Sequence, residues 1–292
     1  MNPRYVFVGN REYVLREMIN QGLDIQKVWV MENSFLHNRL LKDPFIDFVV
    51  IGKKKDLLRE IRETDFDILI SNGCKYILPI SQLMEEKGKK DIRFINVHPS
   101  FLPDLKGMDP INGACLLGRS GGATCHNMDD GIDSGSIISR IEIPMTEDID
   151  AGLLFQLSFK AEVEVFRAAL RSGFTCRQPE KVIDNPIYYS ISDDDLIMDS
   201  NKGVDYLLRQ ARAFGYRSKG VCVRIDGQDF RYFGAEEITN QYIRDMFKDI
   251  PEKRIGIAFE KSVVFKLDGR IVRLNQLTVD NAGCLEGKYL EK

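Results

Sequence analysis

Short apolar runs alternate with amphipathic segments over the first hundred residues of the chain. The runs are rich in β-branched and aromatic residues and cover residues 4–9, 25–31, 45–52, 67–73 and 93–98. The segments between them carry apolar residues at helical spacing, most clearly at 11–22, 55–63 and 80–88. Buried strands that alternate with amphipathic helices predict a mostly parallel sheet with helices on both faces, an α/β fold of Rossmann-like type.

The pattern changes after residue 108. A short helix is predicted at 112–118, strands at 122–128 and 136–145, and a long helix at 152–173 that a glycine ends. Residues 177–190 hold two prolines and no periodicity, which is typical of a linker.

A second, smaller domain is predicted beyond this linker. One helix at 203–215 precedes short strands separated by turns, and "IDGQDF" and "LDGRIV" carry the Asp-Gly signal of β-hairpins. The expected organisation is therefore a mostly parallel α/β domain at 1–178, a linker at 179–190, and a small, mostly antiparallel β domain at 191–292.

The composition of the 292 residues is that of an ordinary globular protein, with 43% apolar and 29% charged residues. A net charge of −3 argues against a protein whose main task is to wrap nucleic acid. The first residues lack the features of a signal peptide, and no apolar run is long enough to span a membrane. The six cysteines are scattered, which favours reduced thiols and a cytoplasmic location.

Polar side chains are expected at the carboxyl ends of the strands, where open parallel sheets collect reactive groups. The first candidates are Gly9, Asn10 and Arg11, in the turn from the first strand into a helix. Free N–H groups at such a turn suit a phosphate, although an ordinary strand-to-helix turn explains them equally well. The stretch is not the GxGxxG fingerprint of a dinucleotide site.

Asn96 and His98 form the second candidate. Residues two apart in a strand point to the same side, so both side chains are expected in one crevice. An asparagine amide can donate to a developing oxyanion, and a histidine can move protons near pH 7. A histidine that is merely hydrogen-bonded at a strand end is the simpler alternative.

The third candidate is Asp133, in the loop "MDDGIDSGSII" at 128–138. From there its carboxylate could reach His98 across the crevice and orient the imidazole. Asp129 and Asp130 alone would be interpreted as a solvated turn.

The order of these motifs resembles a known family. "NVHPSFLPDLKG" followed about 35 residues later by "DDGIDSGSII" is similar to the signature of the folate-dependent formyltransferases. "SNGCKYILP" at 71–79 looks like the hinge that lines their pterin pocket. Residues 207–238 resemble the start of the small β-barrel that follows the catalytic domain in methionyl-tRNA and sugar N-formyltransferases. This resemblance implies that residues 1–178 are a catalytic domain and that residues 191–292 form an OB-like β-barrel. The resemblance implies transfer of a formyl group from 10-formyltetrahydrofolate to an amine.

The resemblance also implies roles for individual residues. Asn96, His98 and Asp133 would be catalytic. The folate would be bound by Lys75, Tyr76, Ile77, Leu78, Met128, Asp129, Asp130, Gly131 and Ile132. The acceptor would be bound by Gly9, Asn10, Arg11, Lys106 and Gly107. His37, which is expected in a polar loop, and the neighbours Cys125 and His126 lack metal-ligand spacing, so no metal site is predicted.

The acceptor is expected to be a nucleotide-linked amino sugar. The main alternative is methionyl-tRNA, but residues 186–292 hold 17 Lys and Arg against 17 Asp and Glu, which gives no basic surface for tRNA. Lys106 also stands where the tRNA enzymes have arginine. Another small amine of the hydroxyornithine type, or an inactive folate- or nucleotide-binding module, remains open. The β-rich domain has strand edges, and a homodimer is expected as a further partner interaction.

Overall fold

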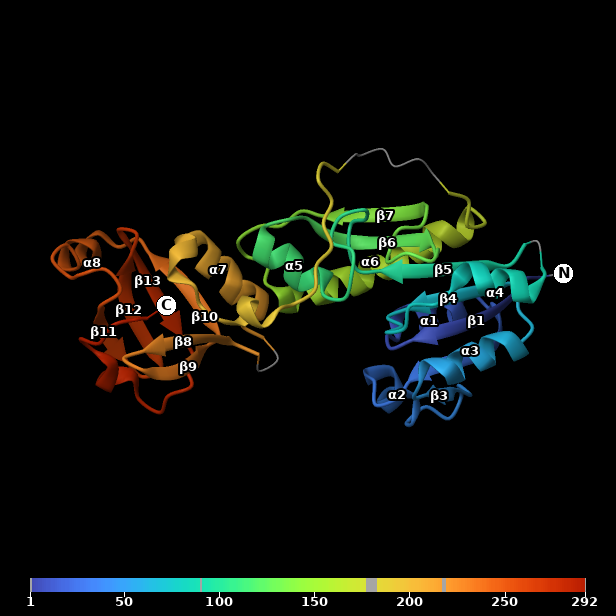
Figure 1. The fold of residues 1–292 in the computed structure, drawn as a ribbon, viewed down its shortest axis with the longest axis horizontal. Helices are drawn as coiled ribbons and strands as arrows, with labels where there is room; N and C mark the ends of the chain where they lie inside the picture. Colours follow the sequence, from blue (N-terminus) through green and yellow to red (C-terminus); the bar gives the residue numbers. More distant parts are fainter. Residues whose placement is uncertain (1, 90, 177–182, 217–218, 292) are drawn as a thin grey trace. The chain divides into compact units, whose positions relative to one another are not determined.

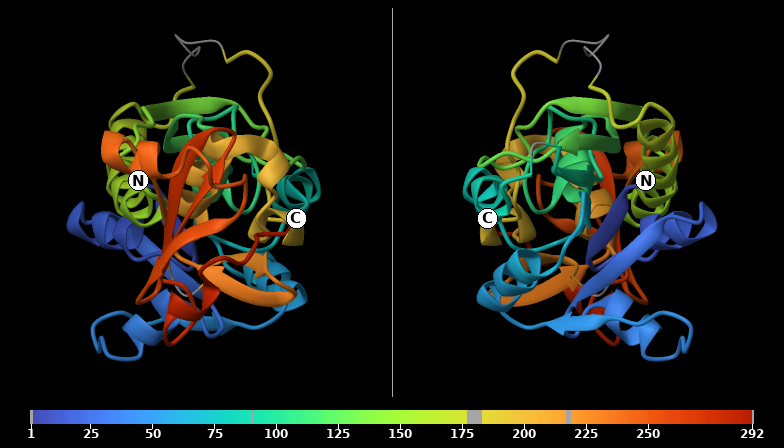
Figure 2. Two further views of the ribbon diagram at one scale, coloured as in Figure 1. Left: turned by 90° about the vertical axis from the view of Figure 1, so that its left-hand side faces the viewer. Right: turned by 90° about the vertical axis from the view of Figure 1, so that its right-hand side faces the viewer.

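The computed structural model describes residues 2–89, 91–176, 183–216 and 219–291. The chain divides into two compact units (Figure 1). Figure 2 gives two further views of the same ribbon. The first unit contains residues 1–107, 120–144 and 155–188, and the second unit contains residues 108–119, 145–154 and 189–292.

The first unit is built on a seven-stranded sheet. Its strands are β1 (Arg4–Gly9), β2 (Asp24–Met31), β3 (Val49–Ile51), β4 (Ile68–Asn72), β5 (Arg93–His98), β6 (Gly121–Asn127) and β7 (Ile137–Ile143). Their order in the sheet is β3-β2-β1-β4-β5-β6-β7; β1 to β5 are parallel, whereas β6 and β7 are antiparallel to their neighbours. The predicted mostly parallel sheet is confirmed, although β3 is shorter than the apolar run at 45–52.

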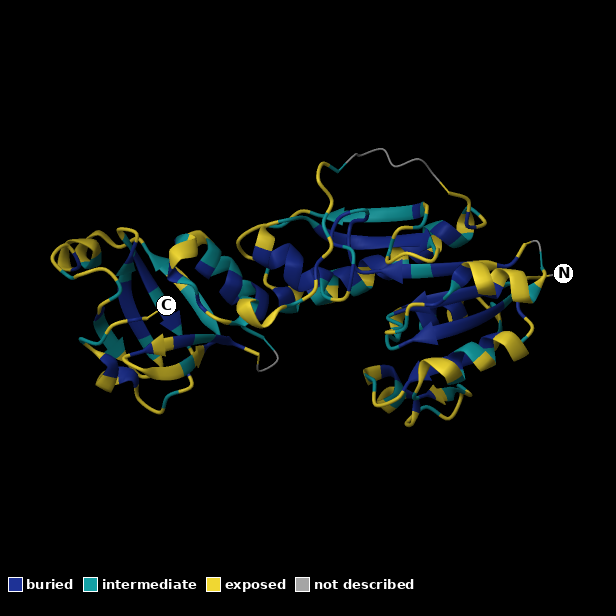
Figure 3. Cartoon of the chain, in the orientation of Figure 1, coloured by how far each residue is buried: buried dark blue, intermediate teal, exposed yellow. Residues whose placement is uncertain are grey.

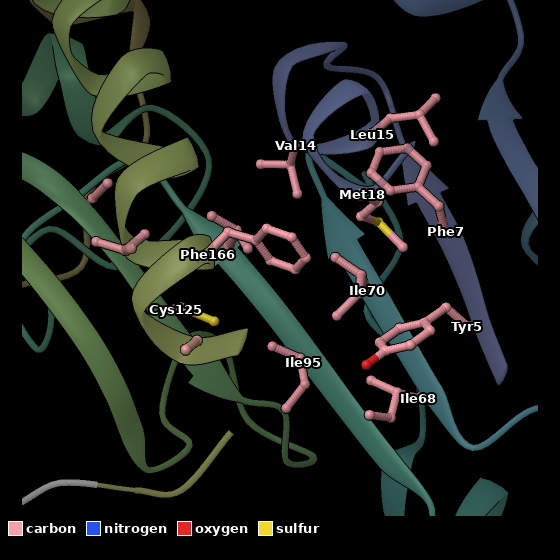
Figure 4. Close-up of a cluster of buried hydrophobic side chains, with 14 of the residues drawn as sticks. Tyr5, Phe7, Val14, Leu15, Met18, Ile68, Ile70, Ile95, Cys125 and Phe166 are labelled. Atoms are coloured by element: carbon pink, nitrogen blue, oxygen red, sulfur yellow. The ribbon is translucent and has the colours of Figure 1, made fainter. Parts of the chain in front are cut away.

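Helices cover both faces of this sheet, as the alternation predicts. They are α1 (Tyr13–Asn20), α2 (Phe35–Leu40), α3 (Lys54–Glu63), α4 (Ile80–Lys87) and α6 (Ala151–Arg171), of which residues from 155 onward belong to the first unit. On one face, Phe7, Ile70 and Ile95 pack against α1 and α6 (Figure 4). On the other, Val8 and Leu69 pack with side chains of α3 and α4. Successive strand residues face opposite sides of the sheet, so the central strands β1 and β4 and the neighbouring β6 are buried almost throughout (Figure 3). The outer strands β3 and β7 and the first half of β2 are more exposed.

Helix α2 is absent from the prediction, which placed His37 in a polar loop. The Ser34 hydroxyl accepts the N–H of His37 at 3.1 Å and caps the helix. Leu36 and Leu40, four apart, supply the buried side chains. A helix of six residues offers too few positions for its periodicity to be recognised in the sequence.

The second unit contains the helices α5 (Pro110–Leu117), α7 (Gly203–Phe214) and α8 (Gln241–Met246) and 3₁₀ turns at Asp193–Leu196, Ser200–Lys202 and Ala282–Leu285. Its strands are β8 (Val221–Ile225), β9 (Gln228–Tyr232), β10 (Gly234–Ile238), β11 (Ile255–Phe259), β12 (Ser262–Leu267) and β13 (Arg270–Asn275). All pairings among them are antiparallel, as predicted. They form a four-stranded sheet, β10-β13-β12-β11, and a separate pair, β8-β9, so the OB-like barrel is not confirmed.

Helix α5 belongs to the second unit although it lies far from α7 in the sequence. The Asn112 amide donates to the Ala213 carbonyl at 2.7 Å, and the Arg209 guanidinium donates to the Leu116 carbonyl at 3.0 Å. These side chains fix α5 against α7 through main-chain acceptors, since the last carbonyls of a helix lack partners within it.

The two units interleave along the chain, whereas the predicted domains were continuous ranges. Residues 179–182 of the expected linker lie outside the described residues. Residues 183–188 belong to the first unit, where Tyr188 bridges to Lys106. Among the helices of the described ranges, none combines the length and the apolar character needed to cross a membrane.

Candidate active site

Asn96, His98 and Asp133 come together at one end of the sheet. Asn96 and His98 are the last alternate residues of β5, and Asp133 lies in the loop between β6 and β7. The Asn96 amide nitrogen lies 3.3 Å from Asp133 Oδ1, and His98 Nδ1 lies 3.6 Å from the same oxygen. The three polar groups therefore meet around one carboxylate.

Main-chain geometry holds Asp133 in place. Its φ of 48° is in the left-handed region, which aspartate tolerates better than most residues. Its Oδ2 accepts the N–H of Gly107 at 2.9 Å. Burial alone would raise the pKa of Asp133, but the His98 and His126 rings and the Gly107 N–H hold it well below its usual range. Asp133 is therefore a fixed negative charge at neutral pH.

His98 is a neutral imidazole at pH 7. Burial lowers the pKa of His98 from 6.5 to about 4, against the opposing charge of Asp133. Because Asp133 faces Nδ1, the single proton of the neutral ring is best placed there, and Nε2 keeps its lone pair. Nε2 is buried and has no hydrogen-bond partner within the described part of the chain. His98 thus presents an unused proton acceptor.

His126 is a fourth member of the cluster, which the sequence interpretation considered only as a metal ligand. Its Nε2 lies 3.2 Å from the Asn96 amide nitrogen and 3.7 Å from Asp133 Oδ1. The signal that could have found it is the antiparallel pairing of β6 with β5, which sets His126 directly opposite Asn96. The Asn96 amide nitrogen, expected to face a developing oxyanion, lies instead beside Asp133 and His126.

The loop predicted to bind the folate at 128–132 is hydrogen-bonded to the start of α4, which follows the other predicted segment, 75–78. Asp130 Oδ1 accepts the N–H of Ser81, in the first turn of α4, at 3.0 Å. Tyr76 donates its hydroxyl to the Gly52 carbonyl at 2.8 Å, and Lys75 lies 5.2 Å from the centre of the Tyr76 ring. Asp129 accepts from the N–H of Gly131 at 3.0 Å, so the loop at 128–132 is ordered by its own side chains.

The apolar residues of these segments divide into two groups. Leu78 is buried in the core, and Met128 packs against the same cluster, which is the ordinary structural role for such residues. Ile77 and Ile132 instead expose 54% and 40% of their surface. Ile77 and Ile132 can therefore contact a ligand, whereas the buried side chain of Leu78 cannot.

Gly9, Asn10 and Arg11 lie where predicted, at the end of β1. A Cβ at Gly9 would lie 2.1 Å from the Asn72 carbonyl oxygen, so the position accepts only glycine. The Asn10 N–H donates to that same oxygen at 3.2 Å. These contacts account for Gly9 and the main chain of Asn10 without any ligand.

Arg11 has a partner inside the first unit. Its guanidinium pairs with Glu162 of α6 and lies 5.1 Å from the centre of the Phe159 ring. Glu162 is completely buried, and burial raises its pKa while Arg11 opposes the shift. Nothing in the sequence singled out Glu162, because a glutamate on a long amphipathic helix is usually exposed.

Lys106 and Gly107 precede the point where the chain enters the second unit. Lys106 is partly buried, and its N–H donates to the Ile187 carbonyl at 3.0 Å. Gly107 was predicted to bind the acceptor, and its N–H holds Asp133. In the described ranges, no three His, Cys, Asp or Glu side chains are grouped so as to hold a metal ion.

The part of the chain that carries this site matches a known family model. Residues 51–170 match the family model described as formyl transferase. A methionyl-tRNA formyltransferase from Clostridioides difficile is 31% identical over 123 residues, which are 42% of this chain and 38% of that protein. The chain spans less than two thirds of the length of the first curated relatives that it matches.

Two solved structures share the fold over nearly the whole chain. The sugar 3N-formyltransferase WlaRD, solved with dTDP and 5-N-formyl-THF, is 18% identical with a TM-score of 0.68, covering 94% of this chain and 98% of that one. The N-formyltransferase from Helicobacter canadensis, in complex with folinic acid and dTDP-3-aminofucose, is 17% identical with a TM-score of 0.65, covering 94% and 99%. Residues 51–170, which contain Asn96, His98 and Asp133, therefore match a formyl transferase domain.

Proposed function

We propose that this protein transfers the formyl group of 10-formyltetrahydrofolate to the amine of a nucleotide-linked amino sugar. The observation that carries the proposal is the meeting of Asn96, His98 and Asp133 at the carboxyl edge of the sheet. A buried neutral imidazole beside a fixed carboxylate is suited to taking a proton from an attacking amine.

The reaction needs one proton acceptor and stabilisation of one negative charge. The amine nitrogen attacks the formyl carbon, and the carbonyl oxygen becomes an oxyanion. His98 Nε2 accepts the proton that the amine loses, and Asp133 stabilises the imidazolium that forms. The imidazolium stabilises the oxyanion and then returns the proton to the leaving folate nitrogen as the carbon–nitrogen bond breaks. The products are a formamide and tetrahydrofolate.

The folate donor is a co-substrate, and its place is proposed beside residues 75–78 and 128–132. The Ser81–Asp130 hydrogen bond ties the second segment to the first turn of α4, which directly follows the first segment. Main-chain groups of such ordered loops can match the donors and acceptors of a pterin ring. Ile77 and Ile132 offer exposed apolar contacts.

The choice of a sugar acceptor rests on charge and on likeness of fold. WlaRD is described as a sugar 3N-formyltransferase, and the Helicobacter canadensis protein was solved with dTDP-3-aminofucose. Residues 186–292 are electrically neutral in sum, which does not favour tRNA. Methionyl-tRNA is the second candidate, because several curated relatives are methionyl-tRNA formyltransferases. We also propose a homodimer, which sedimentation analysis would test.

A panel of acceptors tests the proposed function. Purified protein is incubated with 10-formyltetrahydrofolate and dTDP- or UDP-linked 3-amino or 4-amino sugars, or with methionyl-tRNA. Formamide products are identified by mass spectrometry, and tetrahydrofolate release is followed in parallel. We expect turnover with at least one sugar and a loss of about 10²–10⁴-fold in Asp133→Asn, whose charge is removed at nearly constant shape.

Three results would contradict the proposal. Turnover with methionyl-tRNA alone would replace the sugar by tRNA as acceptor. Wild-type rates in Asp133→Asn would remove the carboxylate from the mechanism. Binding of folate or nucleotide without turnover of any amine would make the chain a binding module.

A further inference from the structure

His126 faces the catalytic asparagine from the neighbouring strand. It is 2% exposed, and its position in β6 lies directly opposite Asn96 in β5. The titratable groups that face its ring among the described residues are Asp133, at 3.7 Å, and His98. The mechanism above gives this buried imidazole no task.

The hydrogen bonds of His126 define its tautomer. Nδ1 lies 2.7 Å from the main-chain carbonyl oxygen of Asn127. A carbonyl oxygen only accepts, so Nδ1 must carry a proton. In a neutral ring the other nitrogen is then an acceptor, and Nε2 directs its lone pair at the Asn96 side chain, 3.2 Å away.

This tautomer decides which end of the Asn96 amide faces inward. A lone pair on Nε2 requires an N–H group opposite it, and Asp133 Oδ1, at 3.3 Å from the same amide nitrogen, requires another. Both protons of the Asn96 amide group are therefore used. A reversed amide would place its oxygen against two acceptors and leave buried groups unpaired, which is unfavourable. The amide oxygen of Asn96 is the end left for a ligand.

We infer that His126 is a positioning residue that fixes Asn96 so that its amide oxygen accepts an N–H of the attacking amine. This inference rests on the proposed function. A primary amine has two N–H groups, and the edge of β5 offers two acceptors for them, the Asn96 oxygen and His98 Nε2. Holding both N–H groups directs the nitrogen lone pair toward the formyl carbon. The proton that leaves the amine still goes to His98.

Nuclear magnetic resonance of the free wild-type protein tests the tautomer without any substrate. The chain has three histidines, so ¹⁵N-histidine spectra can be assigned with His37→Gln and His98→Gln variants. From these contacts we expect the His126 ring to carry its proton on Nδ1 and a lone pair on Nε2. A proton on Nε2, in either the neutral or the charged ring, would overturn the inference. Because no turnover is measured, this outcome is independent of whether the protein formylates an amine.

Two substitutions test the consequence for catalysis. In His126→Gln the side-chain oxygen can still accept from Asn96, whereas His126→Leu offers no acceptor. We expect kcat to fall roughly 10- to 100-fold in His126→Leu, with the KM for the folate donor nearly unchanged and substantial recovery in His126→Gln. Equal losses in both variants, or losses that follow thermal stability alone, would reduce His126 to a structural role.

Discussion

At the scale of single residues, the site depends on keeping His98 uncharged next to a carboxylate. Two effects on the pKa of His98 oppose each other. Burial disfavours the imidazolium and lowers the pKa, whereas the charge of Asp133 raises it, and the effect of burial is the larger. In this setting His98 stays uncharged in the free protein and can accept a proton from a substrate. The same balance makes the fold sensitive to acid.

The free energy of unfolding should therefore rise with pH between about 4 and 6.5. Because the pKa of His98 is lower in the folded than in the unfolded protein, the unfolded chain binds more protons in this window. The contribution of His98 to the free energy of unfolding is fully present above its pKa in the unfolded chain, 6.5. It is lost as the pH falls toward its pKa in the folded protein, about 4. The shift corresponds to about 3 kcal/mol.

Denaturant unfolding across this pH range provides the measurement. His98→Gln should flatten the dependence, while the same change at His37, on α2, should leave it as in the wild type. Parallel curves for the wild type and His98→Gln would mean that His98 is not held neutral by the fold.

At the scale of elements, the turn after β1 is tied to α6 by a buried ion pair. Arg11 reaches from the turn to Glu162, whose Oε2 has no hydrogen-bond partner in the described ranges. Glu162 is fully buried, and its carboxylate is compensated by the Arg11 guanidinium with a further hydrogen bond from the Asn72 side chain. The pair therefore links the first strand to the longest helix of the first unit.

Arg11→Met should lower the free energy of unfolding by about 3–5 kcal/mol at neutral pH, because it leaves a buried charge uncompensated. Burial then raises the pKa of Glu162 further above its unfolded value. For a group whose pKa is raised in the folded protein, the contribution to stability is fully present below its pKa in the unfolded chain and is lost as the pH rises. The free energy of unfolding of Arg11→Met should therefore be smaller at pH 8 than at pH 5. Unfolding measured at both pH values tests this.

Two further variants complete the test. Adding Glu162→Gln to Arg11→Met should restore most of the stability at pH 8, since the neutral amide needs no counter-charge. Arg16→Met, which breaks a more exposed pair with Glu12 and Asp43, should cost only about 0–1 kcal/mol. An Arg11→Met variant as stable at pH 8 as at pH 5 would disagree with a buried charged pair.

The elements also show what sequence patterns can and cannot predict. The strand that carries both Asn96 and His98 was predicted at its observed bounds, 93–98, because a mostly buried strand leaves an apolar run in the sequence. Short helices such as α2 leave no such run. His126 and the Gly107 N–H were missed as partners of the site since their roles depend on strand pairing and loop closure, which are contacts between distant parts of the chain.

At the scale of the whole molecule, no single position in the sequence divides the chain into its two units. Helix α5 and residues 145–154 belong to the second unit, although the first unit continues on both sides of them in the sequence. Seven residues of α5 are buried, and the helix is fixed to α7 by Asn112 and Arg209.

A fragment of residues 1–178 should therefore aggregate at concentrations where the full chain stays in solution. Removing α7 exposes apolar side chains of α5 such as Ile111 and Leu116. Size-exclusion chromatography and thermal unfolding would show the difference. Ile111→Ser with Leu116→Gln in the fragment should improve its solubility, and a monomeric fragment as stable as the full chain would contradict the interleaved arrangement.

The interleaving also limits how new enzymes can be assembled from this one. A chimera that exchanges residues 189–292 for those of a relative would leave α5 facing a foreign α7, so the donor must supply 108–119 and 145–154 as well. The first of these grafts begins one residue after Gly107, whose N–H holds Asp133. Such a chimera therefore has a junction beside the Asp133 carboxylate, where a displaced Gly107 peptide group would remove the hydrogen bond that holds this side chain.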